Sequence, residues 1–178
     1  FGSALHKSDY VTNGVPVINP MQIINGKIVP TDSMAISSHI VEKLSNFKLS
    51  SGDIVIGRRG DMGRCALVTD AEDGWLCGTG SMIVNAGSTL DSSFLQRFLS
   101  SKQAITAIEN ASVGTTMINL NQATLKNLYV ILPPKLEQTA IATALSDVDA
   151  LITELEKLIA KKQAIKTATM QQLLTGRT

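Results

Sequence analysis

The C-terminal stretch that begins at Glu137 constrains the fold of this chain more than any other segment. Apolar residues recur along it at alternating spacings of four and three, which is typical of a coiled-coil seam: Ile141, Leu145, Val148, Ile152, Leu155 and Ile159. No Gly or Pro interrupts the chain until Gly176, so the pattern predicts one helix from about residue 137 to about residue 174, roughly 55 Å long. A domain of this size cannot cover such a helix along its whole length, and the seam therefore needs a partner helix.

The charges on this stretch are sorted along its length. The acidic residues lie in the first half and the basic residues in the second half and tail: Glu137, Asp147, Asp149, Glu154 and Glu156, then Lys157, Lys161, Lys162, Lys166 and Arg177. This order suits the helix dipole, and in an antiparallel pair of two copies each acidic half faces a basic half. A solvated helix face explains the presence of charges but not their order. We therefore expect antiparallel pairing.

The first 134 residues contain short runs rich in β-branched residues, separated by turn residues. These runs predict strands over residues 15–18, 22–24, 27–29, 53–57, 64–68 and 128–132, and a further strand that begins over 82–84. Asn25-Gly26 is a signal for a tight hairpin. Gly78-Thr79-Gly80-Ser81 is followed by neither a phosphate-binding lysine nor a helix, so a turn is the better interpretation.

Short helices are predicted between and after these strands. Asp91 offers N-cap chemistry to a helix that carries Phe94, Leu95, Phe98 and Leu99. A second helix carries Ile105 and Ile108, a polar loop spans 112–119, and a third helix lies at about 122–125. Pro133-Pro134 ends the globular part. The sequence thus predicts an α+β fold, with a β-rich domain over 1–134 and a long helix over 135–178.

Composition excludes several classes of protein. With 44% hydrophobic and 17% charged residues the chain should fold, and no apolar run approaches the roughly 18 residues that cross a bilayer. Without an N-terminal leader pattern, we expect a cytoplasmic protein. Cys65 and Cys77 lack CxxC spacing, and His6 and His39 stand alone, so we expect buried thiols and no metal site. Because the chain begins at Phe1 instead of Met, we expect it to be a piece of a longer polypeptide.

Short motifs over nearly the whole chain resemble the specificity subunit of Type I restriction-modification enzymes. The C-terminal match is Leu132-Pro133-Pro134-Lys135-Leu136-Glu137-Gln138, Ile141-Ala142, Leu145-Ser146-Asp147-Val148-Asp149, Lys161-Lys162, Ile165-Lys166 and Met170-Gln171-Gln172-Leu173-Leu174-Thr175-Gly176. The N-terminal match is Gly14-Val15-Pro16-Val17-Ile18, Gly52-Asp53-Ile54-Val55-Ile56 with Arg58-Arg59-Gly60 and Gly63, and Gly114-Thr115-Thr116 with Ile118-Asn119. The first part is similar to a target recognition domain, and the second to the conserved helical region that follows it.

The resemblance implies a DNA-recognition subunit without a catalytic centre. Family members carry two recognition domains and two antiparallel helices, whereas this chain has one of each, so it is either the C-terminal half of a two-domain subunit or a half-size subunit that forms a homodimer. It would read one half of a bipartite double-stranded DNA target, with the helix as spacer. S-adenosylmethionine, ATP and Mg would then bind modification and restriction subunits docked on it, and this chain would hold no cofactor.

Residues suited to DNA contact gather in two loops. Arg58, Arg59 and Arg64 can bond guanine bidentately, the alternative being an ion pair with Asp61 or Asp53. The polar loop supplies Thr115, Thr116 and Asn119, which could bond a phosphate or a base edge, or could instead form caps and turns. Further candidates are Gln22 and Asn25 for adenine, although the predicted turn explains Asn25 more simply, and Lys27 and Lys48 for phosphate.

Two other classes of function stay open at this point. The chain could be a coiled-coil scaffold that no longer binds DNA, or it could itself be a nuclease or methyltransferase. Asn19-Pro20-Met21-Gln22 lacks the second proline and the aromatic residue of the adenine-methyltransferase motif. Asp53 and Asp61 flank arginines instead of forming a carboxylate cluster. The residues therefore favour DNA recognition over catalysis.

Overall fold

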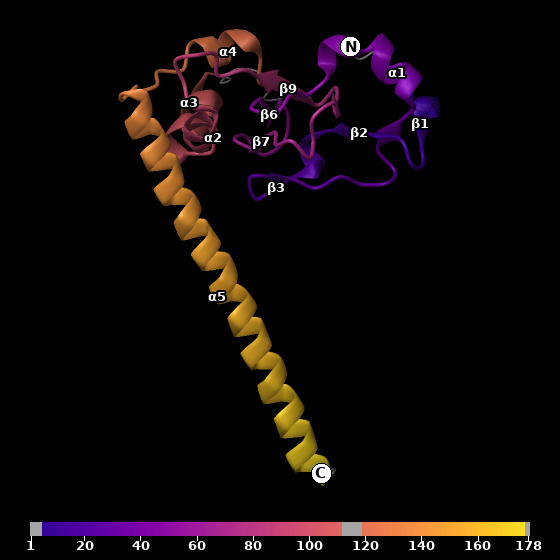
Figure 1. The fold of residues 1–178 in the computed structure, drawn as a ribbon, viewed down its shortest axis with the longest axis vertical. Helices are drawn as coiled ribbons and strands as arrows, with labels where there is room; N and C mark the ends of the chain where they lie inside the picture. The colour runs from indigo at the N-terminus through magenta and orange to yellow at the C-terminus, as the bar shows by residue number, and fades with distance from the viewer. Residues whose placement is uncertain (1–4, 112–118, 177–178) are drawn as a thin grey trace. The chain divides into compact units, whose positions relative to one another are not determined.

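The computed structural model describes residues 5–111 and 119–176 of the chain (Figure 1). It has two compact units, Phe1–Gln138 and Thr139–Thr178. The first unit is rich in short strands with short helices, and the second is part of one long helix, so the predicted α+β fold with a long C-terminal helix is confirmed.

The elements of the first unit are short. Its strands are β1 (Tyr10–Val11), β2 (Val15–Ile18), β3 (Ile23–Ile24), β4 (Lys27–Ile28), β5 (Ala35–Ile36), β6 (Ile54–Gly57), β7 (Cys65–Leu67), β8 (Leu76–Cys77) and β9 (Ser81–Val84). Its α-helices are α1 (Ser38–Lys43), α2 (Ser92–Leu99), α3 (Lys102–Asn110) and α4 (Gln122–Lys126), and its 3-10 turns are η1 (Lys7–Asp9), η2 (Pro20–Gln22) and η3 (Ser45–Phe47).

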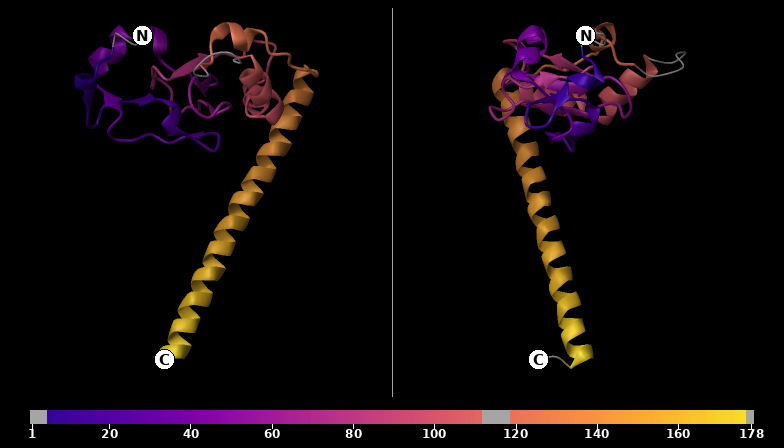
Figure 2. Two further views of the ribbon diagram at one scale, coloured as in Figure 1. Left: turned by 180° about the vertical axis from the view of Figure 1, so that it is seen from behind. Right: turned by 90° about the vertical axis from the view of Figure 1, so that its right-hand side faces the viewer.

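Strand β6 is the centre of a three-stranded antiparallel sheet in the order β7-β6-β9. Successive side chains of a strand point to opposite faces, and both faces of β6 are covered. Ile54 and Ile56 pack with residues of α2 and α3, such as Leu99 and Ile108, whereas Val55 packs in a second cluster with Ile18. In Figures 1 and 2, α2 and α3 lie beside this sheet. Burial on both faces explains why the sequence of β6 is apolar without alternation.

A second sheet of four strands joins segments that are far apart in the sequence. Its order is β1-β5-β2-β8, and β2 runs parallel to β8 with Val17 opposite Leu76. A third cluster forms around this sheet, where Val17, Ile36 and Leu76 are fully buried with Val41 of α1. The strand predicted over 15–18 is therefore confirmed, and its partner strands are two-residue segments that carry no clear pattern of their own.

The hairpin predicted at Asn25-Gly26 is present. Strands β3 and β4 pair antiparallel with Ile24 opposite Lys27, and the two residues between them have φ angles of 50° and 74°. A two-residue turn of this type needs positive φ at both positions, which Asn and Gly tolerate best. The local sequence thus determines this hairpin.

The helix predicted after Asp91 and the helix predicted to carry Ile105 and Ile108 are both present, as α2 and α3. The Asp91 carboxylate accepts a hydrogen bond from Phe94 N at 2.9 Å, and the Ser101 hydroxyl accepts one from Ala104 N at 3.2 Å. Each cap satisfies an amide that the first helical turn leaves without a partner. Helix α4 confirms the third prediction, with Asn121 as its cap.

The strand predicted over 128–132 is wrong. These residues form no strand, and Tyr129 and Ile131 are 95% and 85% exposed. A β-branched and aromatic run becomes a strand only where a neighbouring strand takes up its backbone hydrogen bonds. No strand of the described residues pairs with this segment, and Pro133 and Pro134 follow it directly.

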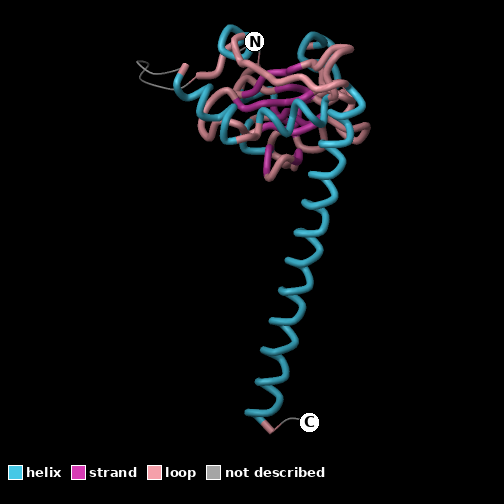
Figure 3. Tube along the Cα trace, turned by 90° about the vertical axis from the view of Figure 1, so that its left-hand side faces the viewer, coloured by secondary structure: helices cyan, strands magenta, loops and turns pink. Residues whose placement is uncertain are grey.

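The long helix α5 (Lys135–Thr175) is continuous over 41 residues, or about 61 Å at 1.5 Å per residue (Figure 3). The predicted seam lies exposed on it, with exposed fractions between 37% and 56% for Ile141, Leu145, Val148, Ile152, Leu155 and Ile159. Exposed apolar side chains in a regular row are costly in water and need a covering surface. The helix itself is confirmed, and its pairing stays a prediction.

Candidate nucleic-acid interface

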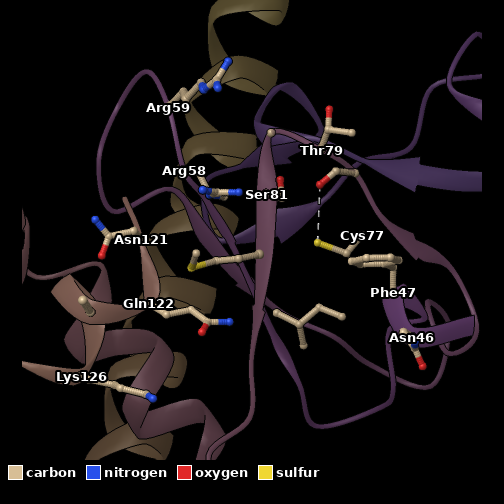
Figure 4. A pocket seen from close by; sticks show the side chains of 15 residues that line it. Asn46, Phe47, Arg58, Arg59, Cys77, Thr79, Ser81, Asn121, Gln122 and Lys126 are labelled. Carbon is tan, nitrogen blue, oxygen red and sulfur yellow. Dashed lines mark hydrogen bonds between the residues drawn. The ribbon is translucent and has the colours of Figure 1, made fainter. Parts of the chain in front are cut away.

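An open groove of about 1090 Å³ lies in the first unit (Figure 4). Five segments meet around it: the end of η3, the residues that follow β6, the end of β8 with the turn after it, strand β9, and helix α4 with its cap. Its polar and charged lining residues are Asn46, Arg58, Arg59, Thr79, Ser81, Asn121, Gln122 and Lys126. We call this hollow the basic groove.

Arg58 is held in the groove by hydrogen bonds from its backbone and its side chain. Its amide donates to Gly80 O at 2.9 Å, and its carbonyl accepts from Leu120 N at 2.8 Å. Its side-chain Nε donates to Leu120 O at 3.1 Å. These bonds join the end of β6 to the β8–β9 turn and to the segment before α4. They fix both the position of the residue and the plane of its guanidinium group.

The charge of the groove has one sign. Arg58, Arg59 and Lys126 line it, and none of its described lining residues is Asp or Glu. Arg59 and Lys126 are exposed, and in Figure 4 the Arg59 side chain extends away from Arg58. Three cations at one hollow create a local positive potential in a chain whose net charge is +1.

The amide side chains of α4 differ in their availability. The Asn121 side chain accepts a hydrogen bond from Thr124 N at 2.9 Å and so serves as the N-cap. Gln122 is exposed, and Figure 4 shows its amide pointing toward the interior of the groove. Gln122 therefore has an amide free to contact a ligand, whereas the amide oxygen of Asn121 is used by the helix cap.

The floor of the groove is apolar, with Phe47, Met82 and Ile83 among the lining residues. The thiol of Cys77 lies there too, where burial raises its pKa to about 12 and the Arg58 charge offsets part of that rise. The buried Ser81 hydroxyl has no hydrogen-bond partner among the described residues. Both cysteines are buried and free, as the sequence predicts.

Arg64 does not join Arg58 and Arg59 in the basic groove. It lines a separate hollow of about 660 Å³ together with Asn25 and residues of α2. Its guanidinium forms an ion pair with Asp61, one of the alternatives left open by the sequence, and also donates to Pro20 O at 3.4 Å.

The other predicted DNA contacts are dispersed. Gln22 is only 2% exposed; its Oε1 accepts from Asn19 N at 3.0 Å and its Nε2 donates to the Thr31 hydroxyl at 3.3 Å, so the structure gives it a structural role. Lys27 is exposed on β4, and Lys48 follows η3. Asn119 is exposed directly before Leu120. Thr115 and Thr116 lie outside the described residues.

Sequence reasoning missed Lys126, Gln122 and Thr79 as groove residues. Thr79 lies in the turn that the glycine pattern predicts, and the helix of Gln122 and Lys126 is predicted as well. The missing information was the hydrogen-bonded contact between Leu120 and Arg58, residues 62 apart in the sequence. No local sequence pattern predicts such a contact.

Among the described residues, no group of three His, Cys, Asp or Glu side chains is placed to hold a metal ion. Nor does any helix in the described parts combine the length and apolarity that a membrane span requires.

The fold and the groove together define a class of protein. A cationic hollow whose described lining includes no carboxylate suits a polyanion, and the exposed seam of α5 suits a second helix. Both features are typical of a nucleic-acid-binding domain carried on a coiled-coil element. Comparison with known families agrees. Residues 2–167 match the model of the Type I restriction modification DNA specificity domain, and the chain belongs to this family.

The relatives of the chain are longer than the chain itself. One relative is the Type I restriction enzyme EcoKI specificity subunit of Escherichia coli strain K12, with 27% identity over 166 residues. The matched residues cover 89% of this chain and 33% of the relative. The fold of this chain is similar to the HsdS subunit of Thermoanaerobacter tengcongensis, with a TM-score of 0.67, 21% identity and coverage of 96% of this chain and 44% of that one. The Type I restriction-modification S subunit of M. genitalium gives a TM-score of 0.58 at 22% identity, over 97% of this chain and 42% of that one.

Proposed function

We propose that this chain reads one half of a split double-stranded DNA target through the basic groove. The observation that carries the proposal is that Arg58, Arg59 and Lys126 line one hollow, whose described lining includes no carboxylate. Phosphates supply most of the affinity in protein–DNA binding, and base edges supply the sequence information. A groove with cations, a free amide at Gln122 and an apolar floor has groups for both. A scaffold that does not bind DNA would have no use for such a lining.

The long helix would set the distance to a second recognition unit. Its exposed seam would pair antiparallel with the helix of a second copy, forming a homodimer, or with that of a second recognition half. Modification and restriction subunits would dock on this assembly in the cytoplasm. The chain would have no catalytic centre and no cofactor of its own, and S-adenosylmethionine, ATP and Mg would bind the partner subunits.

The test is a genome-wide map of adenine methylation. Cells that express this chain with its cognate modification subunit are compared with cells that lack it. A new split motif with two identical inverted halves would indicate a homodimer, and a motif with unlike halves would indicate a second recognition domain. A confirmed complex that gives no new motif would contradict sequence recognition by this chain.

A variant with fewer charges tests whether the basic groove is the surface that binds the methylated DNA. Replacing Arg59 and Lys126 together by Ala should lower the level of methylation at every site. The matched control is Lys102→Ala with Lys43→Ala, which removes two cations that do not line the basic groove. If both double variants methylated alike, the groove would not be the DNA-binding surface.

A further inference from the structure

The cations of the basic groove fall into two kinds. Arg58 is partly buried, and its side chain is tied to Leu120 O through Nε. Arg59 and Lys126 are exposed, and no hydrogen bond or ion pair links them to the described residues. One cation is fixed by the fold, and two are free to move.

The fixed side chain has its two terminal nitrogens available. Nε is used by Leu120 O, and no bond from Nη1 or Nη2 to the described residues is present. Figure 4 shows the guanidinium within the groove, next to strand β9. Two parallel N–H donors at the end of a held guanidinium match the O6 and N7 acceptors on the major-groove edge of guanine.

An arginine whose side chain is already held before DNA binds is better suited to contact a base edge than to neutralise a phosphate. A free arginine loses rotamer freedom when it makes a bidentate contact, and the Leu120 bond has already restricted Arg58. A phosphate contact needs no such restriction, because charge attracts phosphate from many directions. Exposed and mobile side chains such as Arg59 and Lys126 are sufficient for that purpose.

We propose that Arg58 determines specificity by bonding the major-groove edge of a guanine, while Arg59 and Lys126 contribute affinity through phosphates. This division rests on the proposed function, since it takes the basic groove as the DNA-binding surface. It deepens that function by naming the base class that the fold prepares for and the residue that selects it.

The test selects duplexes from a pool with a randomised stretch, using the purified full chain. The wild type should enrich a motif that contains guanine. Arg58→Lys keeps the charge but loses the fork, and should reduce the preference for guanine at one position by about tenfold, with a similar salt dependence. Arg59→Lys is the matched control and should leave the motif unchanged. Arg59→Ala should weaken capture of all sequences alike and lower the salt slope by about one.

A change in the DNA tests the same contact without altering the protein. Each guanine of the selected duplex is replaced in turn by 7-deazaguanine, which lacks the N7 acceptor. One replacement should lower the affinity of the wild type about tenfold and should have little further effect on Arg58→Lys. Even if Arg58→Lys folds poorly, this arm can overturn the proposal, because a wild type that binds every substituted duplex equally makes no guanine N7 contact.

The outcomes separate the two proposals. A wild-type chain that enriches no motif would overturn the proposed function. A motif without guanine, a motif that Arg58→Lys leaves intact, or equal binding to every 7-deazaguanine duplex would overturn the role of Arg58 alone. A motif altered as much by Arg59→Lys as by Arg58→Lys would also overturn the division of roles.

Discussion

The Asn19 side chain accepts a hydrogen bond from the backbone amide of Gly80 at 3.2 Å. This bond links the residue after β2 to the turn between β8 and β9, which carries Thr79 at the edge of the basic groove. The neighbouring Gly78 lies so close that a Cβ atom placed on it would meet Asn19 Oδ1 at 2.4 Å. The glycine-rich turn is therefore packed against Asn19 and has no room for a side chain at Gly78.

We expect Gly78→Ala to lower the free energy of unfolding by about 1–3 kcal/mol, because the added methyl group overlaps the Asn19 amide. Denaturant unfolding of both single variants and of the double variant with Asn19→Ala measures the coupling. The alanine at position 78 should cost less once the Asn19 side chain is absent. Equal costs in both backgrounds would show that this contact does not limit the turn.

Gln138 is 2% exposed and makes hydrogen bonds to three backbone groups. Its Oε1 accepts from Asp91 N at 2.8 Å, and its Nε2 donates to Pro133 O at 2.9 Å and to Thr89 O at 3.3 Å. We expect Gln138→Leu to lower the free energy of unfolding by about 2–4 kcal/mol, because it removes three hydrogen bonds that this buried side chain makes to the backbone. Denaturant unfolding measures the loss.

Gln138→Glu extends this prediction to pH. An introduced carboxylate would be buried against the Thr89 and Pro133 carbonyls, so its pKa should be raised in the folded state. The variant protein then has its full stability below the ordinary pKa of a glutamate, about 4.3. It loses stability as the pH rises through the higher pKa that the carboxyl has in the folded state. The melting temperature of this variant relative to the wild type should fall between pH 4 and pH 7. A constant difference over that range would contradict the arrangement.

Ser81→Ala should leave stability unchanged or raise it by up to about 1 kcal/mol. The Ser81 hydroxyl is buried without a hydrogen-bond partner among the described residues, so its removal breaks no hydrogen bond there. The removal also eliminates the free-energy cost of taking a polar group out of water. Thermal melting compares it with Ser50→Ala, a change at an exposed serine. Destabilisation by more than the control would show that the hydroxyl has a partner.

The two thiols should be unreactive in the folded protein. Burial raises the pKa of both Cys65 and Cys77, the latter to about 12, so neither forms the nucleophilic thiolate at pH 8. A thiol reagent should label both only after denaturant is added. Because the folded pKa of Cys77 is raised, its contribution to stability is complete below about pH 9 and is lost as pH rises toward 12. Rapid labelling without denaturant would contradict this burial.

Reversing the charges of Lys161, Lys162 and Lys166 to Glu should weaken pairing of the long helix and assembly with modification subunits. In an antiparallel pair these positions face the acidic half of the partner helix. Mass measurement of the complex in solution, repeated at high salt, gives the effect. An unchanged mass and unchanged assembly would count against antiparallel pairing.

Elements governed by local chemistry could be predicted from the sequence. Asn25-Gly26 determines its hairpin, Asp91 caps α2, and the unbroken seam predicts α5. Elements governed by distant partners could not. The two-residue strand β8 exists because β2 lies beside it, and residues 128–132 form no strand because none pairs with them.

The candidate site divides in the same way. Arg58 and Arg59 stand out because two arginines share a glycine-rich loop. The same pattern also selects Arg64, whose ion pair with Asp61 only the structure shows. Lys126 and Gln122 reach the groove through the backbone contact between Leu120 and Arg58, which depends on tertiary structure. A sequence gives the type of each side chain, but it does not give the groups that the side chain contacts in the folded protein.

The frame of the basic groove is made of main-chain hydrogen bonds. Gly57 N donates to Arg64 O, Arg58 N to Gly80 O and Leu120 N to Arg58 O, and none of these bonds depends on the identity of a side chain. Side chains that project from such a frame can be exchanged without moving the frame itself. Under the proposed function, a library that varies positions 58, 59, 79, 122 and 126 could therefore change the DNA sequence that is read and leave the scaffold untouched.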